Sequence, residues 1–396
     1  MKAIRVRCAA LALALCFAAG CSAPAASPGF KLGLDLPLSG IDGATGIPTR
    51  DAVILAIEDA NRTGFPGGFK VTLEDLDDTV QGKHDPAQGA QNIKTLVADD
   101  AVLAAVGPLN SNVAAAEIPV AAAAGLPLLT MGASAVGLTR TAPAGSPPTT
   151  FFRLCAADDR QGAAVARFAI GDGHRRAFVI DDNESYGKGI ADVFVAAFAK
   201  DGGTVVGREH LTAFALDYKA LLTKARALGP DMVFFGGIVS TGGAVLRRQM
   251  RDAGLGDLPY YAGDGIANPE YVALAGPAAD GTAFTLGGPT PTFSPVSRAF
   301  AAAYAKRFGA APGNYSPAAY AAAQVALTAI RAELAAHPDR LPTRAEVRAR
   351  IAATKGLVTP IGAVAFDAAG DLLRPVISLY RVRGGRIVYS GTTQTN

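Results

Sequence analysis

The stretch VGPLNSNVAAAEIPVAAAAGLPLLTMGAS, residues 106–134, decides the fold that the sequence predicts. It begins at the end of one apolar run, Val102–Val106, and contains a second apolar run, Leu126–Met131. An alanine-rich segment with the composition of a helix lies between the two runs. A strand, a helix and another strand in this order are typical of a parallel β-α-β unit, so the stretch predicts a parallel sheet.

Small or short polar residues follow both predicted strands. Asn110 and Ser111 stand where the helix begins, and Gly132, Ala133 and Ser134 follow the second strand. Open α/β sheets bind ligands beyond the carboxyl ends of their strands, where helix N–H groups and a serine hydroxyl suit a carboxylate. We expect Ser111, Ala133 and Ser134 to hold the carboxylate of a small ligand. The alternative is that these residues only end strands and cap a helix.

Alternating strand and helix patterns extend on both sides of this stretch. Before it, strands are expected at 30–36 and 69–73 and helices at 48–61 and 85–98. After it, a second alternating run predicts strands at 151–153, 177–180, 204–206, 232–235 and 260–261, and helices at 158–170, 190–200, 218–227 and 244–253. The glycine-rich turn 37–46 lacks phosphate-loop spacing, so we interpret it as a flexible loop that lines a cleft. The repetition predicts two similar lobes.

The C-terminal part contains too few segments for a third domain. Helices are expected at 293–308 and 317–336, and strands at 364–366 and 375–382. We expect these segments to return to the two lobes and complete them. The predicted fold class is therefore α/β, with two doubly wound parallel-sheet lobes and a cleft between them.

The first twenty residues have the pattern of a secretory signal peptide. Lys2, Arg5 and Arg7 precede an apolar run at 8–19, which is too short for a stable membrane span. The sequence AAGC that ends at Cys21 is similar to a bacterial lipobox, so we expect Cys21 to be lipidated. Residues 21–29 would then be a lipidated tether. The alternative is an ordinary cleavage site with an incidental cysteine.

Composition excludes several classes of function. The net charge of the chain is +3, and removing the three basic residues of the signal leaves 34 basic and 34 acidic residues. This balance gives no reason to expect a nucleic-acid partner. Only Cys21 and Cys155 would remain after processing, so no disulfide is expected.

Patterns for catalysis or metal binding are missing from the sequence. No serine lies in a G-x-S-x-G context, and no H-E-x-x-H occurs. The pairs Asp77-Asp78 and Asp181-Asp182 could bind a metal, but we interpret them as solvated strand ends. The histidines are interpreted as surface residues: His84, His174, His210 and His337. We expect no enzyme activity, no metal and no cofactor.

Two further residues follow predicted strands and suit a ligand. Asp264 lies in a Gly-Asp-Gly turn, where its carboxylate could pair with an ammonium group. Tyr186 lies in the sequence ESYG and would offer a flat apolar ring and a hydroxyl at the mouth of a cleft. The alternatives are an ordinary aspartate in a turn and a capping loop.

Together these segments resemble the periplasmic leucine/isoleucine/valine-binding proteins, the solute-binding subunits of branched-chain amino acid ABC transporters. The likeness covers residues 31–389 and includes PLSG, AIEDANRTG, the DD and DPAQGA stretches, VGPLNSN, LLTMGAS, FRLCAADDRQG, ESYGKG and FFGG in the family's order. Each motif is weak alone, and their shared order makes the likeness specific. The resemblance implies two lobes that are joined by three crossings, near 153–157, 286–288 and 373–375, and that close on a ligand by a hinge.

The resemblance also implies roles for the residues of the cleft. The counterparts of Ser111 and of the turn Gly132-Ala133-Ser134 hold an α-carboxylate in the family's amino-acid binders. The hydroxyl that matches Ser134 and the carbonyl that matches Ala133 also help to hold the α-ammonium group.

Other positions of the cleft concern the ammonium group, closure and the ligand's side chain. The acid that matches Asp264 pairs with the ammonium group, and the tyrosine that matches Tyr186 helps to close the cleft. Thr45 and Ile238 stand where some relatives carry tyrosines that shape the side-chain pocket. Asn110 takes the place of one cysteine of a pair that bridges the first lobe in some relatives.

The sequence thus predicts a lipid-anchored solute-binding protein in the periplasm or cell envelope. We expect a monomer that captures an amino acid, branched-chain or otherwise aliphatic, and delivers it to the permease subunits of an ABC transporter. The predicted first lobe comprises residues 30–156 and 287–373, and the second comprises 157–286 and 374–396. The alternatives are the same fold binding an amide, urea or an aromatic acid, a ligand-sensing receptor, and an enzyme with a nucleotide cofactor.

Overall fold

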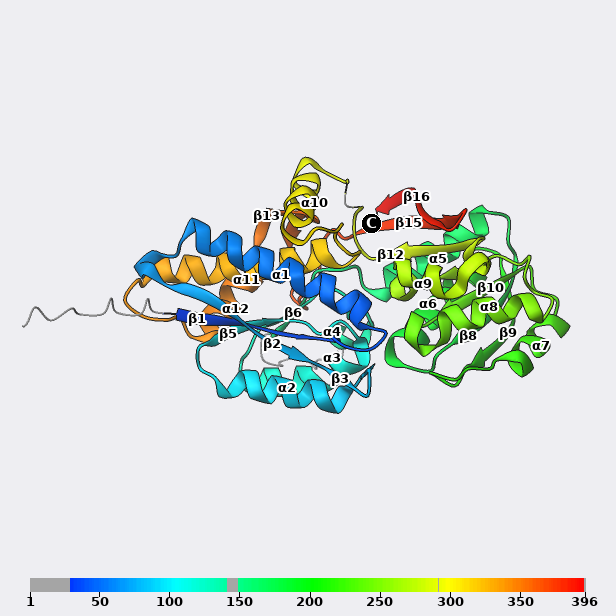
Figure 1. Ribbon diagram of the computed structural model, residues 1–396, viewed down its shortest axis with the longest axis horizontal. Coiled ribbons are helices and arrows are strands. Elements are labelled where there is room, and N and C mark those ends of the chain that lie inside the picture. Colours follow the sequence, from blue (N-terminus) through cyan, green and yellow to red (C-terminus); the bar gives the residue numbers. More distant parts are fainter. Residues whose placement is uncertain (1–28, 141–148, 291, 395–396) are drawn as a thin grey trace, which may run out of the picture.

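The computed structural model describes residues 29–140, 149–290 and 292–394. Two α/β lobes lie side by side along the long axis of the molecule (Figure 1). The main strands of the first lobe are β1 (Gly29–Leu36), β2 (Lys70–Asp77), β5 (Val102–Val106), β6 (Leu128–Thr130) and β7 (Phe151–Arg153). They form a sheet in the order β2-β1-β5-β6-β7, in which all neighbours are parallel.

Helices cover both faces of this first sheet. They are α1 (Gly43–Thr63), α2 (Pro86–Ala98), α3 (Ser111–Ala123), α10 (Pro295–Phe308), α11 (Ser316–Ala336) and α12 (Arg344–Ala352). One core joins β1 to α1 and α11 through buried side chains such as Leu34, Val53 and Ile330. Another core, which contains Ile93 and Val102, joins β5 to α2 and α3. The helices of the C-terminal part therefore complete the first lobe, as the sequence predicted.

Short elements connect these parts of the first lobe. They are η1 (Pro66–Gly68), the hairpin of β3 (Thr79–Val80) and β4 (Lys83–His84), α4 (Gly137–Arg140), and the hairpin of β13 (Lys355–Thr359) and β14 (Gly362–Ala365). The hairpin of β13 and β14 is a two-stranded sheet of its own, and Val364 and Phe366 pack into the core of the first lobe, in agreement with the expectation that residues 364–366 return to a lobe.

The second lobe contains a seven-stranded sheet. Its strands are β8 (Arg176–Asp181), β9 (Thr204–His210), β10 (Met232–Gly236), β11 (Tyr260–Ala262), β12 (Thr282–Leu286), β15 (Val376–Arg383) and β16 (Arg386–Gln394). The order is β16-β15-β12-β11-β10-β8-β9. The pairs β12–β15 and β15–β16 are antiparallel, and the other neighbours are parallel.

The helices of the second lobe also lie on both faces of its sheet. They are α5 (Asp158–Gly171), α6 (Ser185–Lys200), α7 (Lys219–Ala227), α8 (Ala244–Asp252) and α9 (Pro269–Ala275), with the shorter helical turns η2 (Val239–Gly243), η3 (Asp264–Ile266) and η4 (Gly276–Ala279). Aromatic side chains fill the core under α6, where Phe194 stacks on Phe234 and Phe198. Helices α7 to α9 pack on the other face, around Leu222 and Tyr271.

The chain passes between the two sheets three times. The passages run from β7 to α5, from β12 to α10 and from β14 to β15. They fall at the three places where the resemblance implied crossings. The residue boundaries that we assigned to the lobes remain a prediction. The predicted signal peptide, the predicted lipidation site Cys21 and most of the predicted tether at 21–29 lie outside the described residues, as do residues 141–148.

The start of α1 corrects one expectation from the sequence. The helix begins at Gly43, inside the glycine-rich segment that we interpreted as a flexible loop. The glycines serve close packing there, because a Cβ atom at Gly46 would lie 1.8 Å from the carbonyl oxygen of Pro37. The sequence analysis also missed β12, β16, α9 and α12, which are short or amphipathic elements near the end of the chain.

Arg153 ties the first crossing to the loop after β6. The side chain is fully buried, and its Nε atom lies 2.9 Å from Asp371 Oδ1 in an ion pair. The guanidinium also donates hydrogen bonds to the carbonyl oxygens of Ser134 and Ala135 and to Thr139 Oγ1. One cation therefore fixes the backbone of the loop that follows the predicted site strand.

We predict that Arg153→Met lowers the free energy of unfolding by about 3–5 kcal/mol, because it leaves the buried carboxylate of Asp371 without a cation and removes hydrogen bonds to two carbonyl groups. Denaturant unfolding followed by circular dichroism measures the change. The matched control is Arg307→Met, which removes a solvent-exposed ion pair with Glu58 and should leave the midpoint nearly unchanged. Equal effects of the two substitutions would contradict the role given to Arg153.

Candidate functional site

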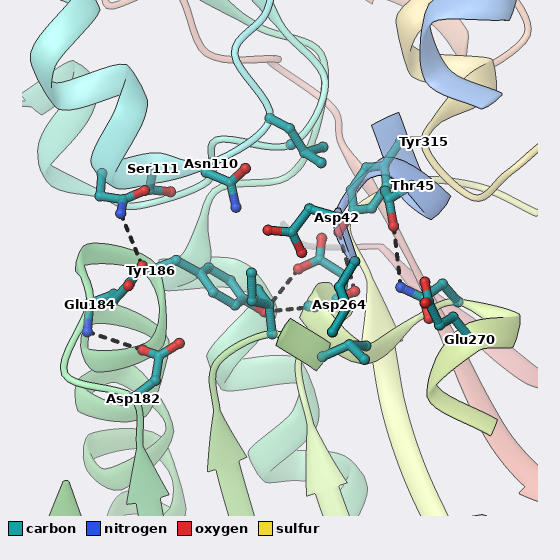
Figure 2. Close-up of a pocket in the computed structure, with 18 residues that line it drawn as sticks. Asp42, Thr45, Asn110, Ser111, Asp182, Glu184, Tyr186, Asp264, Glu270 and Tyr315 are labelled. Atoms are coloured by element: carbon teal, nitrogen blue, oxygen red, sulfur yellow. Dashed lines mark hydrogen bonds between the residues drawn. The ribbon is translucent and has the colours of Figure 1, made fainter. Parts of the chain in front are cut away.

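A cleft lies between the lobes, at the carboxyl ends of the parallel strands of both sheets. The loops after β1, β5, β6, β8, β10 and β11 all contribute to its walls. The space between its atoms, open mouth included, is about 690 Å³. The lining residues are Ile41, Asp42, Thr45, Leu109, Asn110, Ser111, Asn112, Gly132, Asp182, Glu184, Tyr186, Ile238, Val239, Asp264, Gly265, Asn268, Glu270 and Tyr315 (Figure 2).

Most of the residues that the sequence analysis selected line this cleft. They are Asn110, Ser111, Gly132, Tyr186, Ile238 and Asp264, together with Thr45. Ala133 and Ser134 do not line it, since both are fully buried behind its wall. The structure thus brings together side chains from both lobes that are up to 219 positions apart in the sequence, from Thr45 to Asp264. Their roles toward a ligand remain predictions.

The N-terminus of α3 lies in the wall of the cleft, where Asn110, Ser111 and Asn112 line it, and Val113 N donates to Asn112 Oδ1. The first four N–H groups of a helix have no partner within the helix, and the side chain of Asn110 makes no capping hydrogen bond here. Ser111 Oγ accepts a hydrogen bond from Ala135 N, which leaves the serine hydroxyl proton free to be donated. The helix is 13 residues long, so its dipole also favours an anion at this end.

The loop after β6 differs from what we expected. The N–H groups of Gly132 and Ala133 both donate to Thr130 Oγ1, and that hydroxyl donates to the carbonyl oxygen of Pro108. Two N–H groups that we expected to hold a carboxylate are thus used within the loop. In this arrangement the loop supports the start of α3, and Gly132 contributes a surface without a side chain.

Asp264 supplies a buried carboxylate at the centre of the cleft. Its Oδ1 atom accepts hydrogen bonds from Tyr186 Oη at 2.9 Å and from Gln161 Nε2 at 3.0 Å. Within the described part of the chain, Oδ2 accepts no hydrogen bond. Burial raises the pKa of Asp264 to about 6, although the hydrogen bonds from Tyr186 and Gln161 lower it. A cationic group at Oδ2 would satisfy this oxygen and favour the ionised form.

The glycines beside Asp264 permit close contacts that hold the turn. A Cβ atom at Gly263 would lie 2.3 Å from Tyr186 Oη, and one at Gly265 would lie 2.2 Å from the carbonyl oxygen of Gly237. Gly265 N also donates to Tyr186 Oη. The Gly-Asp-Gly sequence therefore places the tyrosine hydroxyl directly against the carboxylate.

Hydrogen bonds cross from one lobe to the other around the cleft. Asn112 Nδ2 donates to Glu184 Oε2 at 3.0 Å, and Asn268 Nδ2 donates to Thr45 Oγ1 at 3.2 Å. Tyr315, at the start of α11, donates its hydroxyl to the carbonyl oxygen of Asp264. The dashed lines in Figure 2 show the contact with Glu184 and the contact with Thr45 at opposite ends of the cleft.

His84 corrects the expectation that all four histidines are surface residues. It is buried, because the β3–β4 hairpin carries it into the interface between the lobes. Its Nδ1 atom lies 2.8 Å from Asp42 Oδ2 and its Nε2 atom lies 3.1 Å from Glu184 Oε2. Burial lowers the pKa of His84, but the hydrogen bonds and charges of Asp42 and Glu184 raise it more, to about 10. A protonated His84 therefore joins an acid of each lobe.

The paired aspartates also differ from the sequence interpretation. Asp78, Asp181 and Asp182 are buried rather than solvated. Asp181 forms ion pairs with Arg208 and His210, whereas Asp182 accepts hydrogen bonds from Thr241 Oγ1 and Glu184 N. Burial raises the pKa of Asp182 to about 6, against the hydrogen bonds that lower it.

Sequence reasoning missed several acidic residues that line the cleft. Asp42, Glu184 and Glu270 were not selected, and Asp182 was assigned to a solvated pair. Asp42 precedes α1, Glu184 precedes α6, and Glu270 lies in the first turn of α9. An acidic residue at a helix start is ordinarily explained by capping or by the helix dipole, so nothing in the sequence distinguishes these from structural residues.

The described residues contain neither a candidate metal-binding group nor a candidate membrane-spanning helix. Nowhere in 29–140, 149–290 and 292–394 do three or more His, Cys, Asp or Glu side chains form a group that could hold a metal ion. None of the helices in the same ranges is long and apolar enough to cross a membrane. Cys155 is a free, buried thiol whose pKa is raised by burial.

Comparison with known proteins identifies the class and then the family. A two-lobed α/β fold with a cleft at the carboxyl ends of its strands is that of the type I periplasmic binding proteins. A model of the periplasmic binding protein family matches residues 29–386. The chain therefore belongs to this family, and several of its relatives are named as Leu/Ile/Val-binding or leucine-binding proteins.

Individual relatives match over nearly the whole chain. The Leu/Ile/Val-binding protein BraC3 of Rhizobium johnstonii is 32% identical over 92% of this chain and 95% of its own length. The leucine-binding protein LivK of Thermotoga maritima superposes with a TM-score of 0.81 at 26% identity, covering 92% of this chain and 98% of its own. LivJ of Streptococcus pneumoniae, in complex with isoleucine, gives a TM-score of 0.81 at 25% identity, covering 93% and 100%.

We predict that His84→Gln weakens the contact between the lobes, because it removes the cation shared by Asp42 and Glu184. The raised pKa makes the stabilising effect of His84 complete below about pH 6.5, the unfolded value, and lost as the pH rises through about 10. The difference in unfolding midpoint between parent and variant should therefore shrink across this range. His337→Gln, at an exposed histidine, is the control, and a pH-independent difference for His84→Gln would contradict the ion pair.

Proposed function

We propose that the protein captures an α-amino acid between its two lobes and carries it to an ABC transporter. One observation supports this proposal: a helix N-terminus at Ser111 and a buried carboxylate, Asp264, line the same cavity. An α-amino acid is the small molecule that presents a carboxylate and an ammonium group on one carbon atom. The relatives bind such ligands, since LivJ of Streptococcus pneumoniae was solved with isoleucine.

Recognition would divide between the two lobes. The first N–H groups of α3 and the hydroxyl of Ser111 would hold the α-carboxylate, and Asp264 Oδ2 would accept from the α-ammonium group. Tyr186 orients the carboxylate of Asp264 through its hydroxyl. The apolar walls at Ile41, Leu109, Ile238 and Val239 suit the carbon atoms of an aliphatic side chain, branched-chain residues included.

The biological role follows from the family rather than from the cleft. We propose that the chain is exported, anchored by lipid at Cys21 and held at the outer face of a membrane in the periplasm. Residues 21–29 would be a flexible tether, and the closed lobes would dock on a permease as a monomer. The lobes would close by a hinge at the three passages between the sheets.

The alternative ligands are an amide, urea or an aromatic acid, and a sensing receptor remains an alternative role for the same fold. None of these small molecules carries an ammonium group, so each would leave Asp264 Oδ2 without a cationic partner. The buried acids of the cleft therefore favour an amino acid over them.

We expect a thermal-shift screen of the purified protein to show a rise in melting temperature with one or more amino acids. A ligand at one hundred times its dissociation constant adds about 2.7 kcal/mol of stability. Asp264→Asn keeps the shape of the side chain and removes its charge, so it should weaken amino-acid binding by about a hundredfold. The control Asp257→Asn, at an exposed turn, should bind as the parent does. A rise only with amides or aromatic acids would reject the amino-acid assignment.

We also predict that affinity for the amino acid falls as the pH falls through about 6. The pKa of Asp264 in the free protein is raised to about 6 by burial, so its carboxylate becomes protonated below that pH and no longer attracts an ammonium group. Isothermal titration between pH 5 and pH 8 measures this, and the decrease should approach tenfold per pH unit at the acid end. An affinity that stays constant over the range would contradict an ionised Asp264 as the partner of the ammonium group.

A further inference from the structure

The cleft carries an excess of negative charge. Its lining includes the carboxylates of Asp42, Asp182, Glu184, Asp264 and Glu270, and no lysine or arginine of the described chain lines it. A neutral α-amino acid brings one ammonium and one carboxylate group, and thus leaves this excess unchanged. Charges that are removed from water are costly unless they are paired. The negative charge of the cleft therefore bears on the charge of the ligand that it can hold.

His84 neutralises only part of this charge. It contacts Asp42 and Glu184, and Glu184 also accepts from Asn112. Asp182, Asp264 and Glu270 form no ion pair with any lysine or arginine in the described ranges. Asp264 is assigned to the α-ammonium group in the proposed function, which leaves at least one further carboxylate without a cation.

Glu270 and Asp42 stand together at one end of the cleft. Burial raises the pKa of Glu270, and the negative charge of Asp42 on the opposite lobe raises it further. The hydrogen bond between Thr45 and Asn268 holds the two lobes together beside them, since Thr45 lies one turn after Asp42 and Asn268 lies two residues before Glu270. Two acids of different lobes therefore approach each other without a described cation between them.

In the orientation proposed above, the side chain of a bound amino acid would extend toward Asp42 and Glu270. Figure 2 shows Asn110 and Ser111 on one side of Asp264, and Thr45 and Glu270 on the other. A ligand with its carboxylate at α3 and its ammonium group at Asp264 extends its side chain toward Thr45 and Glu270. The apolar side chains of Ile41 and Ile238 also line the cleft and can contact the carbon atoms of that side chain.

We infer that the ligand is an α-amino acid whose side chain ends in a cationic group, an ammonium or a guanidinium, held between Asp42 and Glu270. This inference rests on the proposed function and specifies the side chain that the cleft prefers. An aliphatic stem would contact the apolar walls, and the terminal cation would pair with one acid of each lobe. A neutral aliphatic side chain would instead bury both carboxylates against carbon atoms.

Isothermal titration with ligand pairs of equal length tests the inference. Lysine is compared with norleucine, and arginine with citrulline, because each pair differs mainly in the terminal charge. We expect the cationic member to bind at least about tenfold more tightly in one of the two pairs. Leucine, isoleucine and valine are included as the neutral ligands of the named relatives.

Substitutions at Glu270 and Asp42 test whether these acids pair with the terminal cation of the ligand. Glu270→Gln should weaken binding of the preferred cationic ligand by about tenfold and leave norleucine or citrulline nearly unchanged. Asp42→Asn should act in the same direction, although it also removes a partner of His84. Glu74→Gln, at a surface ion pair with Lys31 outside the cleft, is the matched control and should change neither ligand.

The outcomes separate this inference from the proposed function. Binding of leucine, isoleucine, valine or norleucine as tightly as lysine and arginine would overturn the cationic side chain and leave amino-acid capture standing. The same holds if Glu270→Gln weakens the neutral and the cationic ligand equally. If no amino acid binds, or if Asp264→Asn binds amino acids as the parent does, the proposed function fails, and the inference fails with it.

Discussion

A carboxylate that is taken out of water has to be paired or protonated, and this requirement governs the cleft. Asp264 meets it on one oxygen through Tyr186 and Gln161, and leaves the other oxygen buried without a hydrogen bond among the described residues. The glycines around it exist because the tyrosine hydroxyl and a neighbouring carbonyl group approach too closely for any side chain. The local sequence Gly-Asp-Gly is thus explained by the carboxylate that it presents.

The same requirement explains how the two lobes meet. Glu184 of the second lobe and Asp42 of the first would repel each other, but His84 lies between them as a shared cation. At the other end of the cleft, Glu270 lies near Asp42 but has no cationic partner of its own among the described residues, and the Thr45–Asn268 hydrogen bond joins the lobes there. One end is therefore closed by the protein itself, whereas the other depends on what enters the cleft.

Much of the fold followed from the sequence, because strand and helix patterns are local. The strands at 102–106 and 151–153 were predicted with their observed bounds, and Ser111 and Asp264 were selected because they follow strands. This reasoning could not find His84, Asp42 or Glu270, because the role of each depends on a partner on the other lobe. Burial was misjudged for a similar reason: Asp182 follows a strand, and only tertiary packing encloses it.

Closure and charge are linked in such a cleft. Bringing the lobes together concentrates acids from both, so closure without a ligand is opposed by repulsion that His84 offsets at one end only. A ligand that pairs with acids of both lobes binds the closed arrangement better than the open one, and that difference in affinity is what shifts the equilibrium toward closure. In the proposed mechanism, the acids without a cationic partner, which make the empty cleft costly, would let a cationic ligand favour closure.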